Sequence, residues 1–406
     1  MRLNLPTTFV LLTIMIDAMG IGLIMPVMPD LIQEVQGTGL SNAAIWGGIL
    51  TTTYAVMQFV FGPIIGNLSD RFGRRPILLL SLFVMAADYI VMALAGSIWL
   101  LLAGRVVGGI TAATHSTASA FMADTLPPEH RGQGFGMVSA AFGLGFVLGP
   151  LIGGVLGDLG TRAPFYAAAA LAGTNFLFGL LILPETVTDE NRRPFRWRRA
   201  NPLGAFANVS ALPGLGRMLV VFFLYQVSFN VYPVIWSYFS TARFGWDSSM
   251  IGVSLAAFGI SIAIVQGGLI RVALARLGER RTVLTGFAFG IVGFILLGFV
   301  TNGILALVLT PFAAIMAMAT PAMQALMSRD TGADAQGELQ GILASVSALA
   351  MIVSPLLMTS VFAYFTGPDA PVYLPGAPFL ASLLLICAGA GLFLTQNRAP
   401  AAKSAP

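Results

Sequence analysis

The 406-residue sequence is poor in charge, cysteine and histidine. Only 9% of its residues are Asp, Glu, Lys or Arg, whereas soluble domains carry about 25%. A single cysteine, Cys387, excludes an intrachain disulfide, and two histidines leave few ligands for a metal. The nucleotide-binding loop G-x-x-x-x-G-K-[ST] and the nucleophile motif G-x-S-x-G are both missing. These absences argue against an ATP-driven pump and a membrane enzyme, and we expect neither a metal nor a cofactor.

Hydrophobic residues make up 57% of the chain. A membrane-spanning helix needs about 20 apolar residues, so runs of that length are candidate spans. There are twelve, at about 7–29, 43–65, 77–95, 98–122, 135–157, 164–183, 216–239, 250–272, 282–300, 303–325, 338–362 and 376–395. The first run contains Asp17 and lacks a small-residue cleavage site, so we expect an uncleaved span. The sequence therefore predicts an all-α integral membrane protein with twelve transmembrane helices.

The basic residues are distributed unevenly along this pattern. With the N-terminus placed in the cytoplasm, eighteen lie in cytoplasmic segments, and two, Arg162 and Arg243, lie in the opposite loops. The positive-inside rule then predicts that both termini are cytoplasmic. The pI near 9.5 follows from this topology, so no nucleic-acid partner is needed to explain it.

The segment 66–76, with the sequence GNLSDRFGRRP, joins the second and third apolar runs. We expect Gly66 to allow close helix packing, Asp70 to face the positive end of a helix, and Gly73 to permit a backbone reversal. Three basic residues would hold this loop on the cytoplasmic side: Arg71, Arg74 and Arg75. The alternative is that the arginines only set the topology.

A degraded copy of this segment follows the eighth run, where LARLGERR occupies residues 274–281. A repeat in the same orientation half a chain away is typical of transporters built from two parallel halves. We predict a six-helix half at 1–184, a cytoplasmic linker at 185–215, a second six-helix half at 216–396 and a disordered tail at 397–406. Substrate sites in such folds lie near the membrane midplane, between the halves.

Four ionisable residues fall within the apolar runs of the first half: Asp17, Asp88, Arg105 and His115. From the helical rise, Asp17 lies roughly 15 Å and Asp88 roughly 18 Å into their spans. Ionisable groups at that depth are functional candidates by default, although a carboxylate can also be paired for structure alone. Arg105 stays charged and needs an acid or water. His115 suits either a proton relay or a packing hydrogen bond.

Neutral polar residues mark a candidate substrate pathway. In the first half, Tyr54 and Gln58 share one helix face, and Gln58 could equally be an interhelical hydrogen bonder. The second half has no acid, lysine or histidine at midplane depth, and its candidates are Gln226, Asn230, Gln266 and Gln324. The fifth run carries a pattern of small residues that would bring helices close together or serve only packing, including Gly145, Gly149 and Pro150.

These motifs resemble those of the major facilitator superfamily, and specifically its drug/proton antiporter branch. The loop G-x-x-x-D-R-x-G-R-R, the pattern Asp17…Pro26…Pro29 and the fifth-run glycines are similar to those of the bacterial tetracycline/proton antiporters. The resemblance implies a substrate-contacting role for Gln58, a proton-transfer role for Arg105, and export rather than uptake. It fails at Ile262 and Gly290, where that family has a histidine and an aspartate.

The sequence therefore predicts a monomeric, proton-coupled transporter in the bacterial inner membrane that exports an amphipathic, drug-like molecule by alternating access. The missing histidine and aspartate put metal–tetracycline exchange in doubt. A channel fits less well than a two-half carrier with midplane acids. The alternative function is a proton symporter or a uniporter for a metabolite on the same fold.

Overall fold

The computed structural model describes residues 5–112, 114–189, 192–197, 201, 202, 204, 215–332 and 335–395. The predicted tail, 397–406, the side chain of His115 and much of the predicted linker lie outside this described part. All regular structure within it is helical.

The first half of the molecule consists of the helices before the linker. They are α1 (Leu5–Ile24), α2 (Met28–Gln36), α3 (Leu40–Phe72), α4 (Arg74–Leu94), α5 (Ile98–Thr111), α6 (Thr114–Thr125), a 3₁₀ turn at Pro128–His130, α7 (Arg131–Gly157) and α8 (Ala163–Ile182). The fourth predicted span is divided into α5 and α6. The short amphipathic helix α2 was not expected as a separate element.

The second half follows the linker. It contains α9 (Leu215–Phe229), α10 (Val231–Phe244), α11 (Ser248–Ile264), a π-helical segment η3 (Val265–Leu269), α12 (Ile270–Phe299), α13 (Gly303–Ala314), a 3₁₀ segment η4 (Ile315–Met318), α14 (Ala319–Arg329), α15 (Gln336–Thr366) and α16 (Ala377–Leu394). Three of its predicted spans thus change helix type or break on the way across.

The number of spans agrees with the sequence prediction. Eleven segments of the described chain are long and apolar enough to cross a membrane, and one of them, Ser248–Phe299, is 52 residues long. At about 1.5 Å per residue it is more than twice the thickness of a bilayer core. It turns at Gly278, whose φ of 73° lies outside the helical region, so it forms two spans, and the eleven segments give twelve.

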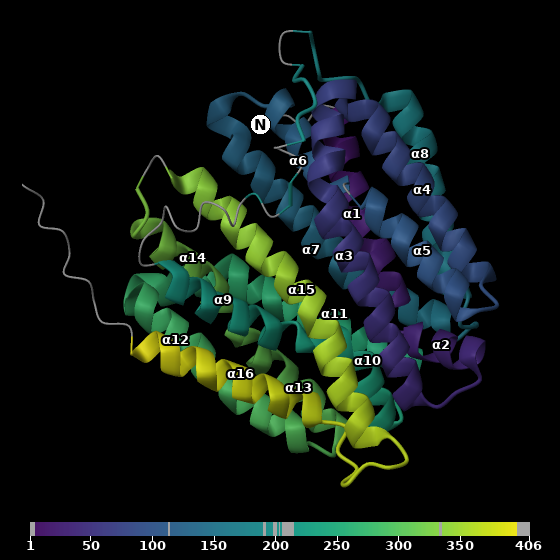
Figure 1. The fold of residues 1–406 in the computed structure, drawn as a ribbon, viewed down its shortest axis with the longest axis vertical. Helices are drawn as coiled ribbons and strands as arrows, with labels where there is room; N and C mark the ends of the chain where they lie inside the picture. Colours follow the sequence, from purple (N-terminus) through teal and green to yellow (C-terminus); the bar gives the residue numbers. More distant parts are fainter. Residues whose placement is uncertain are drawn as a thin grey trace, which may run out of the picture.

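The two halves meet along two helix pairs, α3 with α15 and α7 with α11 (Figure 1). Their contacts concentrate at one end, where the hydroxyl of Ser41 on α3 lies 3.0 Å from that of Thr366 on α15. We call this the closed end. The opposite end carries Gly73, Gly278 and most of the arginines, and we call it the arginine-rich end. The two halves move apart from the closed end toward the arginine-rich end.

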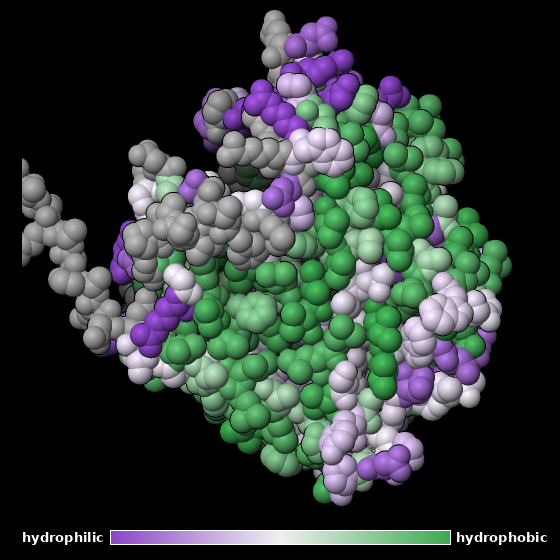
Figure 2. Space-filling view, in the orientation of Figure 1, coloured by the Kyte–Doolittle hydropathy of each residue, from purple (hydrophilic) through white to green (hydrophobic). Residues whose placement is uncertain are grey.

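The surface is divided in the same direction. Figure 2 shows a broad hydrophobic zone across the helices, with hydrophilic side chains gathered toward the two ends. Large apolar side chains are exposed on the long helices, among them Leu181 of α8 at 83% and Leu384 of α16 at 72%. An apolar belt between polar ends is what a bilayer requires of a helical membrane protein.

Candidate functional site

Asp88 and Arg105 form an ion pair inside the first half. Asp88 lies on α4 and Arg105 on α5, and their Oδ2 and Nη2 atoms are 3.0 Å apart. Their side chains are only 5% and 12% exposed, respectively. The pairing expected between Arg105 and a midplane acid is therefore found, and the acid is Asp88.

Two glycines on α5 make room for this carboxylate. A β-carbon at Gly104 would lie 2.5 Å from Asp88 Oδ1, and one at Gly108 would lie 2.8 Å from Oδ2. The close approach leaves Oδ1 buried with no hydrogen-bond partner among the described residues. A buried oxygen with an unused lone pair is a high-energy feature and a natural point for a proton to bind.

Tyr54 and Tyr89 connect this pair to Asp17. The Arg105 guanidinium lies 5.4 Å from the centre of the Tyr54 ring, and both tyrosines interact electrostatically with Asp17. Tyr89 packs on α1 at Gly20, where a β-carbon would lie 2.4 Å from the tyrosine oxygen. Asp17 has no ion-pair partner in the described ranges. Sequence reasoning missed Tyr89, because its contact with Gly20 depends on how α1 and α4 pack.

Gln58 makes an interhelical hydrogen bond, and its contact with substrate stays a prediction. Its amide nitrogen donates a hydrogen bond of 3.3 Å to the carbonyl of Ala112, where α5 ends. Its side chain is nevertheless exposed and lines the gap between the halves. His115 has its backbone in α6, but its side chain lies outside the described part, so its role stays a prediction.

The cleft between the halves lies toward the arginine-rich end and has a volume of about 260 Å³. Its walls come from α3 and α15, and Pro202 of the linker adds to them. The lining residues are Ala55, Gln58, Phe59, Pro63, Pro202, Ala344, Ser345, Ala348 and Met351. Apolar walls with a few polar groups are typical of a small-molecule site.

The polar residues predicted for the second half do not form one cluster. Gln226 on α9 donates to Ser347 on α15 at 3.3 Å, and the next residue, Ala348, lines the cleft. Asn230 stands at the break between α9 and α10, and its side-chain nitrogen is buried without a described partner. Gln266 is exposed in η3, and Gln324 is half-buried on α14. π-Helical segments such as η3 often occur at functional sites.

The positions where the family resemblance fails are apolar in the structure. Ile262 packs against the hydrophobic core. Gly290 is tightly enclosed, since a β-carbon there would lie 2.7 Å from Ile386 and 2.8 Å from the sulfur of Met316. An aspartate at 290 would need these neighbours to move.

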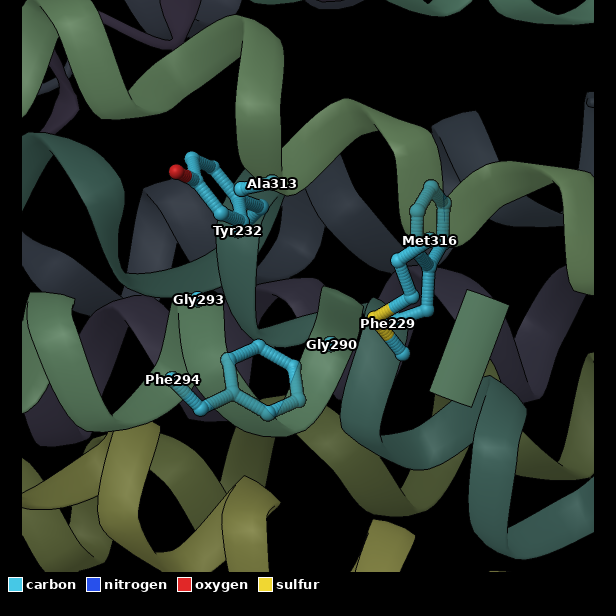
Figure 3. Close-up of a pocket in the computed structure, with 7 residues that line it drawn as sticks. All are labelled: Phe229, Tyr232, Gly290, Gly293, Phe294, Ala313 and Met316. Atoms are coloured by element: carbon cyan, nitrogen blue, oxygen red, sulfur yellow. The ribbon is translucent and has the colours of Figure 1, made fainter. Parts of the chain in front are cut away.

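Gly290 also lines a small pocket inside the second half. Figure 3 shows the pocket residues, from α9, α10, α12, α13 and η4: Phe229, Tyr232, Gly290, Gly293, Phe294, Ala313 and Met316. Its volume of about 10 Å³ leaves room for roughly one water molecule. In this conformation it is too small for a drug-sized ligand.

The glycines of α7 bring that helix against α1, as expected. At Gly145, a β-carbon would lie 2.1 Å from the Met15 carbonyl oxygen, and at Gly149, 2.6 Å from that of Met19. Pro150 follows at the same contact, with its ring beside Gly22. This part of α7 also touches α11 of the other half, because the Pro150 carbonyl would lie 2.3 Å from a β-carbon at Gly252.

The segment 66–76 is almost entirely helical, which differs from the loop expected. Only Gly73 interrupts it, with φ of 113° and ψ of 154°. Gly66 has open space where a side chain would project, so the expectation of close packing there was wrong. The carboxylate of Asp70 pairs with Arg74, one turn onward, at 2.5 Å. The negative group at the start of α4 is instead Glu185.

Glu185 caps α4, a role the sequence did not reveal. Its carboxylate accepts hydrogen bonds from the backbone amides of Arg74 at 2.8 Å and Arg75 at 3.2 Å. A carboxylate is favourable there because the first amides of a helix lack partners. Arg74 also binds Asp124 at the end of α6, at 3.1 Å. Arg71 contacts the ring of Phe72.

The degraded copy of this motif repeats the geometry with the charges exchanged. Gly278, like Gly73, has a positive φ. The next residue, Glu279, binds Arg329 at the end of α14 at 2.7 Å, whereas Arg74 follows Gly73 and binds Asp124. In the first half, Arg74 at the start of α4 forms a salt bridge to Asp124 at the end of α6. In the second half, the acid, Glu279, follows the glycine and the arginine, Arg329, is at the end of α14.

Reversing the second-half pair should first impair and then restore transport. Glu279→Arg places two arginines together, and we expect transport to fall by about two- to fivefold, because the pair is partly exposed and worth about 1 kcal/mol or less. Adding Arg329→Glu should recover most of the loss. The measurement is the initial transport rate at equal protein levels; a double variant as slow as the single one would contradict a role for the pair.

The comparisons with known proteins agree with this architecture. The sequence profile of the Major Facilitator Superfamily matches residues 10–355 and 218–405. The class C tetracycline resistance protein of Escherichia coli is 41% identical over 363 residues, which cover 89% of this chain and 91% of that protein. The class G protein of Vibrio anguillarum is 40% identical, with coverage of 93% and 94%. The resemblance drawn from the motifs is confirmed.

Solved structures have the same fold. The crystal structure of the human organic anion transporter MFSD10 is 27% identical, with a TM-score of 0.68 over 96% of this chain and 99% of its own. A bacterial homologue of the human lysosomal transporter Spinster, in an inward-facing and occupied conformation, gives a TM-score of 0.77 at 17% identity, covering 96% and 95%. With a matching profile over most of its length and relatives of 40% identity, the chain belongs to the major facilitator superfamily.

Proposed function

We propose that this chain is a proton-coupled antiporter that exports an amphipathic, drug-like molecule of the tetracycline type across the bacterial inner membrane. The observation that carries the proposal is the position of the buried Asp88–Arg105 pair. The Arg105 guanidinium contacts the ring of Tyr54 on α3, and the next residue of α3, Ala55, lines the cleft. A pair that can take up a proton beside a substrate pathway can couple the two fluxes. The high identity to tetracycline resistance proteins supports the same reading.

The halves would divide the work. The first half holds the ionisable residues of the apolar runs, Asp17, Asp88, Arg105 and His115, and would carry the proton. The second half contributes a neutral wall to the cleft, in which the flexible side chain of Met351 could adapt to varied ligands. Protonation of an acid would change the charge of the first half and let the halves rock about the site.

The direction of the cycle follows from the arginines. We assign the arginine-rich end, and with it both termini, to the cytoplasm. The cleft then opens toward the cytoplasm, where substrate would bind to the deprotonated carrier. The carrier would work as a monomer. Proton entry from outside would favour substrate release. Because the second half offers no acid or histidine at 262 and 290, substrate recognition would rest on apolar contacts and on amides such as Gln58 and Gln226.

Uncoupler-sensitive tetracycline efflux tests this function. Cells that express the protein should accumulate less tetracycline than control cells, and a protonophore should abolish the difference. Asp17→Asn should abolish it too, at equal membrane levels of protein. The proposal of proton coupling fails if efflux survives both treatments. If correctly inserted protein exports no tetracycline but exports other amphipathic compounds, the antiporter assignment stands and the substrate differs.

A further inference from the structure

The closed end is held by contacts between the two halves, and most of them are neutral. The Ser237 hydroxyl on α10 donates to the carbonyl of Met25 at 2.9 Å, and Ser41 meets Thr366 as described above. At Gly48 of α3, a β-carbon would lie 2.1 Å from the hydroxyl of Thr359. Such hydroxyl and backbone contacts do not respond to pH.

Asp30 is an exception. It lies on α2 and hydrogen-bonds to Ser248, the first residue of α11 in the other half. Ser248 is buried between the halves. A β-carbon at Gly154 of α7 would lie 2.5 Å from the Ser248 carbonyl oxygen, and one at Gly157 would lie 2.8 Å from the Ser248 β-carbon. Asp30 therefore sits on the contact that must separate when this end opens.

The other charged groups nearby have their own partners. Glu34, one turn along α2, binds Arg162 at 3.0 Å and accepts a hydrogen bond from Thr161 at 2.6 Å, both within the first half. Asp247 caps α11 by accepting from the Met250 amide at 2.8 Å. Tyr238 of α10 interacts electrostatically with Asp30.

Of the other helices around α2, α10 also carries Arg243, which donates to the carbonyls of Val300 and Phe299. The closed-end parts of α3 and α5, residues 40–53 and 98–104, contain no acidic, basic or tyrosine residue. Asp158 at the end of α7 is exposed. Asp30 is thus the acid that bonds across the halves here in the described part of the chain.

We propose that Asp30 is a second proton-binding site, separate from the Asp88–Arg105 pair, and that a proton bound there holds the closed end shut. The inference rests on the proposed antiporter function for its biological meaning, but not for its test.

The physical basis is the difference between closed and open surroundings. Burial raises the pKa of the Asp30 carboxyl above its ordinary value of 3.8, although the hydrogen bond from Ser248 acts in the opposite direction. Opening would return Asp30 to water and lower its pKa toward that value. The closed form therefore binds the proton more tightly, and it is favoured as the pH falls through the raised pKa.

This sign suits an antiporter whose closed end faces the outside. Protons from the acidic exterior would bind Asp30 when that end is open and promote closure, which returns the carrier to the inward-facing form. The proton enters and leaves on the same side, so Asp30 would gate the cycle without adding to the number of protons transported.

Distance measurements across the closed end test the proposal without any substrate. In a Cys387→Ser background, spin labels at the exposed positions Asn42 and Asp369 report the separation of α3 from the end of α15 in nanodiscs. As the pH is lowered from about 8 to about 4, close to the ordinary pKa of an Asp carboxyl, the short-distance population should grow. The closed-to-open ratio changes by up to tenfold per pH unit between the two pKa values of Asp30. Asp30→Asn should stay largely closed and lose that part of the response.

Two variants serve as controls. Glu34→Gln changes a carboxylate on the same helix that does not bond across the halves, so it should keep the wild-type pH response. Ser248→Ala removes a hydrogen bond that favours the charged form of Asp30, so it should shift the population toward the open form chiefly at high pH and enlarge the pH response. An unchanged response in Asp30→Asn would overturn the proposal. Loss of transport coupling with an intact Asp30 response would instead count against the antiporter function.

Discussion

Asp88→Asn is expected to abolish proton-coupled transport, with a loss of at least about 100-fold, and also to destabilise the protein. The substitution removes the acid and leaves Arg105 charged in a buried site where it is only 12% exposed. Breaking a buried pair by removing one partner costs about 3–5 kcal/mol, because the other charge remains uncompensated. Efflux in cells and thermal unfolding of the purified protein measure the two effects.

A double variant separates stability from function. Asp88→Asn with Arg105→Gln leaves two neutral groups that can hydrogen-bond to each other, and replacing both partners of a buried pair is often close to neutral for stability. We expect thermal stability near that of the native chain but no proton-driven efflux. Recovery of efflux in the double variant would show that the pair is structural.

The sequence named Arg105 and two possible partners, but neither the choice between them nor their surroundings. An arginine deep in an apolar run needs an acid or water, and the first half has two acids at that depth, Asp17 and Asp88, so Asp88 could be expected as one of two candidates. Tyr89 could not, because its contact with α1 at Gly20 depends on how α1 and α4 cross. The same holds for Glu185 and Asp124, which are brought to Arg74 from the ends of other helices.

Periodicity and composition also limited what could be said of the helices. An apolar run predicts a span but carries no signal for a change of helix type within it, so the π-helical η3 and the 3₁₀ segment η4 were not foreseen. The loop predicted at 66–76 was too long for a related reason. Its polar residues predict the end of a helix, yet α3 continues to Phe72 because polar residues can extend a helix into the water beyond the membrane.

Two neighbouring glycines of α7 should give opposite phenotypes. A β-carbon at Gly153 would lie 2.1 Å from the carbonyl oxygen of Leu23, on α1 of the same half. One at Gly154 would lie 2.5 Å from the carbonyl oxygen of Ser248, on α11 of the other half. Gly153→Val must therefore separate two helices within one half, whereas Gly154→Val must separate the halves at the closed end.

We expect Gly153→Val to lower the stability of the protein by about 1–3 kcal/mol, the usual effect of overpacking a tight contact. Gly154→Val should keep nearly native stability but lose most transport, since the same penalty falls only on the closed form and shifts the closed-to-open ratio by about 10- to 100-fold. Thermal unfolding, efflux and the Asn42–Asp369 distance distinguish the two. If both variants unfolded alike, the halves would not move as separate bodies at α7 and α11. If Gly154→Val transported normally, closure at this end would not be a step of the cycle.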